Sequence, residues 1–228
     1  MKSFVCGTCL LELNRPPAMP GDDLAGGDSG TPAPAGEGKP PGGRHIHPHM
    51  LTVLAALFGL GMILAAWLWT GVIRERDLGA WFPSEHWRAD LILGGLVGAG
   101  FALVAWKLLD YVSAFQRMEQ MLTSVLDMDA LRVYDVLLFG LLAGIPEEIL
   151  FRGAMQAALG WGITSVLFGA LHAVSPAYFA YATLAGLLLG GLAIWRGGLW
   201  TPIAAHVTID TCMFILLLLR WRHAPCRG

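Results

Sequence analysis

The chain has 228 residues, of which 55% are hydrophobic and 14% are charged, and its mean hydropathy is +0.58. These values lie outside the usual range of soluble proteins. Fifteen Lys and Arg against seventeen Asp and Glu leave a net charge of only −2, which argues against a basic nucleic-acid-binding protein and an acidic disordered regulator. We therefore expect an integral membrane protein without a nucleic-acid partner.

The first 49 residues form a separate region, because 17 of them are Gly or Pro. This composition predicts a disordered tail over residues 1–49, followed by a membrane-embedded domain over residues 50–228. A signal peptide would have its apolar run nearer the start, whereas here the first such run begins at Met50. We therefore expect the tail to be retained.

The tail contains one pair of cysteines, Cys6 and Cys9, with the spacing of half a zinc site or of a redox pair. A four-ligand zinc site needs a second pair of ligands. His45, His47 and His49 could complete such a site, but a solvated linker is the favoured interpretation.

Two long stretches, residues 50–73 and 153–195, contain no Asp, Glu, Lys or Arg. In hydrocarbon such stretches are helices, because the backbone must satisfy its hydrogen bonds within the segment. We therefore expect an all-α polytopic membrane protein with about six transmembrane helices. The predicted spans are 50–73, 91–109, 134–151, 155–173, 178–195 and 200–219.

Between the second and third predicted spans, apolar residues recur at steps of three and four, which predicts an amphipathic helix. These residues are Tyr111, Phe115, Met118, Leu122 and Val125. The helix could lie along the membrane surface and admit substrate, or it could simply connect two spans, and the second interpretation is favoured.

Small residues recur within two of the predicted spans, where they allow helices to approach closely. Gly94 and Gly98 are four residues apart, as are Gly186 and Gly190. We expect these glycines to serve packing and not chemistry.

The polar residues inside the spans are the most informative, because each ionisable group in hydrocarbon costs ~2.5–3.5 kcal/mol on insertion scales. They fall into three short motifs, one at the end of the third predicted span and one each in the fourth and sixth. The motifs are Glu147-Glu148-x-x-x-Arg152, Phe168-x-x-x-His172 and His206-x-x-x-Asp210.

The spacing within these motifs predicts how the side chains point. Glu148 and Arg152 are four residues apart on one helical face and can pair. Glu147 is turned about 100° away from Glu148, so it can face a site while Glu148 is neutralised. His206 and Asp210 also share a face.

Two histidines and a carboxylate on different helices are the groups that activation of water requires. A base takes the proton, and donors stabilise the charge that develops on a carbonyl oxygen. A single intramembrane His or ion pair often only holds helices together. Three such elements in one chain instead favour hydrolysis, at a site between the helices of the C-terminal half.

The three motifs, in this order, resemble those of the CPBP or Abi intramembrane proteases, which include the endoproteases that process prenylated CAAX proteins. The resemblance covers about residues 134–219. It implies that Glu147 and His172 activate a water for attack on a peptide bond and that His206 and residue 210 stabilise the oxyanion. Supporting residues would be Glu148, Arg152 and Phe168.

Asp210 is a departure from the family pattern, because many members have Asn at this position. An ionised Asp cannot donate a hydrogen bond to an oxyanion. Either Asp210 stays protonated in an apolar site, or it orients His206 and leaves the donation to that imidazole.

Several alternatives remain open. Zinc is the competing cofactor, since His172, His206 and a carboxylate are ligand types of catalytic zinc, but a metal-independent glutamic protease is favoured. The zinc signature His-Glu-x-x-His is absent from the sequence. From other classes, the chain could be a non-catalytic scaffold or bacteriocin-immunity protein, or a transporter with a proton relay.

The substrate class follows only from the resemblance, which implies a protein or peptide substrate. Its members suggest prenylated CAAX-type proteins or peptides with a leader sequence. The short chain, without organellar targeting, favours a bacterial inner membrane over an endoplasmic reticulum.

Overall fold

The computed structural model describes residues 46–109 and 111–223, and over these ranges it contains helices and no strand. One isolated bridge joins Ile46 to Leu126. The predicted all-α membrane fold is therefore confirmed. The proposed tail lies outside the described residues except for 46–49, as do Cys6, Cys9 and His45.

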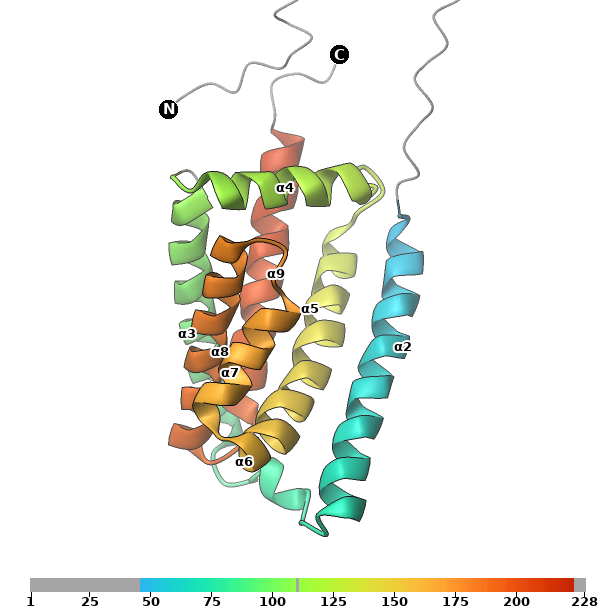
Figure 1. Cartoon of the computed structure of the whole chain (residues 1–228). Coiled ribbons are helices and arrows are strands. Elements are labelled where there is room, and N and C mark those ends of the chain that lie inside the picture. Colours follow the sequence, from blue (N-terminus) through green and yellow to red (C-terminus); the bar gives the residue numbers. More distant parts are fainter. Residues whose placement is uncertain (1–45, 110, 224–228) are drawn as a thin grey trace, which may run out of the picture. The chain divides into compact units, whose positions relative to one another are not determined.

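The helices and short helical turns follow one another closely along the chain (Figure 1). They are α2 (Pro48–Trp67), η1 (Leu68–Ile73), η2 (Gly79–Trp81), α3 (Trp87–Leu109), α4 (Ser113–Val125), α5 (Val133–Glu148), η3 (Ile149–Met155), α6 (Gln156–Leu159), α7 (Trp161–Leu171), α8 (Pro176–Arg196) and α9 (Trp200–Arg222).

Four helical segments of the described chain are long and apolar enough to cross a membrane. They are Pro48–Ile73, Trp87–Leu108, Pro176–Arg196 and Trp200–Arg222. These correspond to four of the six predicted spans and make the chain an integral membrane protein. Leu57, Phe58 and Leu64 are more than half exposed on α2, as expected of side chains that face lipid.

The other two predicted spans are not among these four segments. Residues 134–151 correspond to α5, a helix of 16 residues that runs on into η3. The predicted helix 155–173 is not continuous, because Gly160 has φ 85° and ψ 163°, a conformation that strongly favours glycine. It separates the four residues of α6 from the eleven of α7, so neither piece alone can span a bilayer.

Helix α9 packs closely against α3 because α3 presents glycines to it. A Cβ atom on Gly98 would lie 3.0 Å from the carbonyl carbon of Ala205, and one on Gly94 would lie 2.8 Å from the Ala204 methyl group. Gly186 and Gly190 similarly lie against Ser165 and Trp161. The predicted role of these four glycines in helix packing is confirmed.

Helix α4 crosses the end of the bundle at a steep angle to the other helices (Figure 1). Its apolar side chains Met118 and Leu122 line an internal cavity, and Leu122 also packs on the cluster that contains Leu126 and Leu217. The amphipathic helix is thus confirmed, and part of its apolar side covers the cavity.

Candidate active site

The first motif lies where α5 passes into the π-helical turn η3 at Ile149. Pro146, inside the last turn of α5, has no N–H to donate to the preceding turn. Its ring is held against α2, where a Cβ on Gly59 would lie 2.8 Å from Pro146 Cγ. Single π-helical turns often occur at functional sites, and this one begins directly after Glu148.

Glu148 is fully buried and makes two contacts through one oxygen. Its Oε1 accepts from Arg152 Nη1 at 2.8 Å and lies 2.7 Å from His206 Nδ1. Arg152 also donates to the Gly186 carbonyl at 3.3 Å, and its guanidinium lies 4.5 Å from the Phe168 ring centre. The predicted Glu148–Arg152 pair is confirmed, whereas the sequence analysis missed the contact of Glu148 with His206.

The Glu148 contact assigns the roles of the two nitrogens of His206. Glu148 pairs with the permanently charged Arg152, so it is ionised and can only accept. His206 Nδ1 therefore carries a proton and donates to it. Nε2 is left facing the cavity, 3.8 Å from Glu147 Oε2 and 3.6 Å from Asp210 Oδ2.

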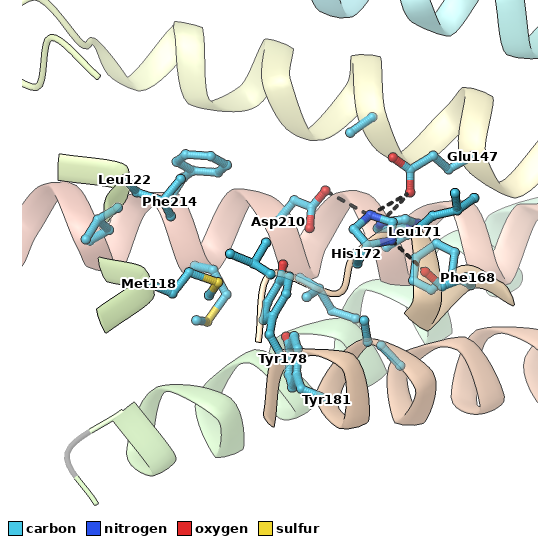
Figure 2. Close-up of a pocket in the computed structure, with 18 of the residues that line it drawn as sticks. Met118, Leu122, Glu147, Phe168, Leu171, His172, Tyr178, Tyr181, Asp210 and Phe214 are labelled. Carbon is cyan, nitrogen blue, oxygen red and sulfur yellow. Dashed lines mark hydrogen bonds and ion pairs between the residues drawn. The ribbon is translucent and has the colours of Figure 1, made fainter. Parts of the chain in front are cut away.

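Glu147 points into the cavity, as its spacing predicts (Figure 2). Its Oε2 lies 3.7 Å from His172 Nε2 and 3.8 Å from His206 Nε2. Both distances are too long for a direct hydrogen bond. Oε2 is buried and has no hydrogen-bond partner among the described residues. A water between the carboxylate and an imidazole would supply the missing partner.

His172 follows the last residue of α7, where the helix end fixes its ring. Its Nδ1 lies 2.8 Å from the Phe168 carbonyl oxygen, which can only accept, so Nδ1 carries the proton. The Nε2 lone pair then faces Glu147. The Phe168 ring supports this arrangement, with its centre 4.5 Å from that of His172 and 5.7 Å from that of His206.

Asp210 lies on the cavity side of His206, one helical turn further along α9. Its side chain is 29% exposed. Glu148 contacts His206 Nδ1, whereas Asp210 faces Nε2 at 3.6 Å, the nitrogen that a bound substrate would approach. The two roles expected for Asp210, donation to the oxyanion and orientation of His206, stay predictions.

The cavity has a volume of about 410 Å³ and joins a polar end to an apolar end. The polar end holds Glu147, His172, His206 and Asp210. The apolar walls include Trp106, Met118, Leu122, Met213, Phe214 and Leu217. Glu119 on α4 also lines the cavity, among these apolar residues. The mainly apolar lining suits a largely apolar ligand whose polar, reacting segment lies at the Glu147 end.

Two tyrosines on the cavity wall, Tyr178 and Tyr181, were missed by the sequence analysis. They lie three residues apart in the first turns of α8, shortly after His172 and the helix-capping Ser175. Their position in a charge-free stretch next to a motif histidine was the signal that could have identified them.

Zinc is the alternative cofactor for these side chains, because His172, His206 and Glu147 are suitable ligand types. Their facing atoms lie 3.7 Å and 3.8 Å apart. Within residues 46–109 and 111–223, no three His, Cys, Asp or Glu side chains are grouped so that they could hold a metal ion. The absence of metal from the mechanism stays a prediction.

The region that contains this site is similar to a known protein family. Residues 129–212 match the model of the Rce1-like type II CAAX prenyl endopeptidases, and this range contains all three motifs. The region is Rce1-like. The match confirms the resemblance that the motifs indicated.

One curated relative aligns with part of the chain. The uncharacterized protein YpbD of Bacillus subtilis is 36% identical over 78 residues, which are 33% of this chain and 41% of that protein. The chain thus aligns with about two fifths of this relative's length. No solved structure matches the chain.

Proposed function

We propose that the Rce1-like region makes this chain an intramembrane endopeptidase that hydrolyses peptide bonds with an activated water. One observation carries the proposal. The buried Oε2 of Glu147, without a hydrogen-bond partner among the described residues, faces Nε2 of His172 and of His206 across 3.7 Å and 3.8 Å. The three groups open on a cavity that an apolar chain can enter.

In the proposed mechanism, a water bridges Glu147 and His172. Glu147 takes one proton as the water oxygen attacks the carbonyl carbon of the peptide, while the His172 lone pair orients the water through its other proton. The tetrahedral intermediate then breaks its C–N bond. The proton held by Glu147 passes to the leaving amine, so the carboxylate is regenerated.

His206 would stabilise the carbonyl oxygen as its negative charge develops. In the imidazolium form both ring nitrogens carry protons, so Nε2–H can donate to the oxyanion while Nδ1–H remains on Glu148. Glu148 and Arg152 would act as positioning residues. Because Arg152 neutralises Glu148, the buried carboxylate can hold His206 without leaving an unpaired charge.

The substrate class is a further part of the proposal. A cavity of about 410 Å³ with mostly apolar walls suits a peptide that carries a prenyl chain, and the family description supports a CAAX-type substrate. A leader peptide that enters from the membrane is the other candidate. We propose a bacterial inner membrane as the location.

The competing functions make different predictions. A scaffold or bacteriocin-immunity protein would keep the polar cluster for packing, so loss of the Glu147 proton acceptor would leave its action unchanged. A transporter would use Glu147 and the histidines as a proton relay and would cleave nothing. A zinc protease would lose activity when its metal is removed.

A comparison of membrane proteomes tests the proposed function. Cells that produce the wild-type chain are compared with cells that produce equal amounts of Glu147→Gln, and peptides with new termini are quantified. The proposal predicts uncleaved precursors in the variant and their products in the wild type. Identical proteomes would contradict it, and the cleaved sequences would show whether a prenylated cysteine is present.

A further inference from the structure

We infer that Tyr178 is a further catalytic residue, whose hydroxyl donates a hydrogen bond to the carbonyl oxygen of the bond being cleaved. The inference rests on the proposed function. When Asp210 is ionised, its carboxylate can only accept hydrogen bonds and cannot donate one to the oxyanion. A phenol keeps its O–H at neutral pH, so Tyr178 can donate the hydrogen bond instead.

The position of Tyr178 is fixed by the turn between α7 and α8. His172 follows the end of α7, and α8 begins with Pro176. The Ser175 hydroxyl oxygen accepts from the Tyr178 backbone N–H at 3.2 Å, so the helix start is capped. Tyr178 is therefore held in the first turn of a rigid helix, a short distance along the chain from His172.

The side chain of Tyr178 lies on the Asp210 side of the site. It lines the cavity with Glu147, His206 and Asp210, and in Figure 2 its hydroxyl end points toward Asp210. The carboxylates of Asp210 and Glu147 are both close enough to act electrostatically on the phenol. A carbonyl oxygen that approaches His206 Nε2 would thus meet the Tyr178 hydroxyl in the same part of the cavity.

Tyr181 lies next to Tyr178 on the same helix and also lines the cavity. Its ring is stacked on that of Tyr178, with centres 5.7 Å apart and planes at 26°. It also contacts the Phe101 ring, at 5.4 Å, and it lies one turn further from the start of α8. In Figure 2, Tyr178 lies between Tyr181 and Asp210. Tyr181 therefore supports the Tyr178 ring from behind.

The charge that develops during the reaction explains why this donor matters. Asp210 and Glu147 are both acidic, so a negative oxyanion beside them needs donors to offset their repulsion. His206 supplies one donor, and Tyr178 would supply a second from the opposite wall. Two donors at one oxyanion are the usual arrangement for acyl transfer.

The test compares Tyr178→Phe with Tyr134→Phe in liposomes, because Tyr134 is about half exposed on α5 and does not line the cavity. The probe is an internally quenched peptide with an S-farnesylated cysteine, or a precursor identified by the proteome comparison. Loss of one oxyanion donor costs ~10²–10³ in turnover, so we expect kcat of Tyr178→Phe to fall by about that factor with KM little changed. Tyr134→Phe should cleave the probe like the wild type.

A double variant, Tyr178→Phe with Asp210→Asn, shows whether Tyr178 acts as a hydrogen-bond donor or only as a structural residue. The amide supplies a permanent N–H beside the oxyanion, so kcat of the double variant should exceed that of Tyr178→Phe alone. A purely structural loss would not be rescued in this way. Equal kcat of Tyr178→Phe and the wild type, or a loss in Tyr178→Phe that Asp210→Asn does not rescue, would overturn the inference.

If Tyr178→Phe fails to fold, 3,5-difluorotyrosine at position 178 replaces it, because this isostere keeps the hydroxyl but ionises at lower pH. The inference predicts that kcat then declines at a lower pH than in the wild type, and an unchanged pH profile would overturn it. Failure of the proposed function would give a different result, because Glu147→Gln would then also process the probe to the same extent as the wild type.

Discussion

His206 Nδ1 lies 2.7 Å from Glu148 Oε1, and the same oxygen accepts from Arg152 at 2.8 Å. This shared oxygen links the first motif to the third across 58 residues of sequence. It fixes the His206 ring so that Nε2 faces Glu147 and the cavity. The two adjacent glutamates therefore have different tasks, one toward the substrate and the other toward the histidine.

Glu148→Gln should lower both stability and activity. The amide leaves Arg152 without its charged partner in a buried site, and breaking such a pair costs about 3–5 kcal/mol. The substitution also weakens the hydrogen bond that orients the His206 ring. We expect a clearly lower Tm in detergent. The control is Glu119→Gln, because Glu119 and Arg220 form a partly exposed pair at 3.4 Å, which is worth about 1 kcal/mol or less. Equal melting of Glu148→Gln and the wild type would contradict this role.

Asp210→Asn tests whether position 210 acts as a donor. If Asp210 donates only when protonated, the amide should retain activity and extend it to higher pH, since an amide N–H does not ionise in this range. Asp210→Ala should lose activity by ~10²–10³. The measurement is kcat against pH for all three proteins. Near-wild-type rates for both variants would instead make Asp210 a packing residue.

Metal removal separates the two protease mechanisms. After exhaustive dialysis against a chelator, a glutamic protease should retain its activity and bind far less than one equivalent of zinc. Cys6 and Cys9 should first be replaced by Ser, so that metal bound there is not counted. If the protein instead contains one equivalent of zinc, loses its activity when the zinc is removed and regains it when zinc is added back, His172 and His206 are metal ligands.

The close contact of α3 with α9 predicts that Ala substitutions at two glycines of α3 change Tm differently. Gly98→Ala would place a methyl group 3.0 Å from the Ala205 carbonyl carbon, whereas a Cβ on Gly100 meets nothing within 4 Å. Overpacking costs about 1–3 kcal/mol. We therefore expect a lower Tm for Gly98→Ala and an unchanged or slightly higher Tm for Gly100→Ala. The opposite order would refute this packing.

The sequence predicted the helical membrane class and the convergence of the motifs, because ionisable residues in apolar stretches are few and their spacing sets their direction. It did not predict the break at Gly160, since one glycine can also be accommodated within a continuous helix. The link from Glu148 to His206 joins helices distant in sequence, so local periodicity contains no signal for it. Tyr178 was missed although it lies in a charge-free stretch shortly after His172, which was a usable signal.

The cleavage activity of Glu147→Gln is the most direct test of whether Glu147 is the catalytic base. Gln keeps the size of the side chain but cannot accept the proton of the attacking water. Wild type and variant are purified, shown to melt alike, and assayed in liposomes with the same quenched farnesylated peptide or proteome-derived precursor. The account predicts cleavage by the wild type and none above background by Glu147→Gln. An undiminished rate in the variant would contradict the assignment of Glu147 as the base.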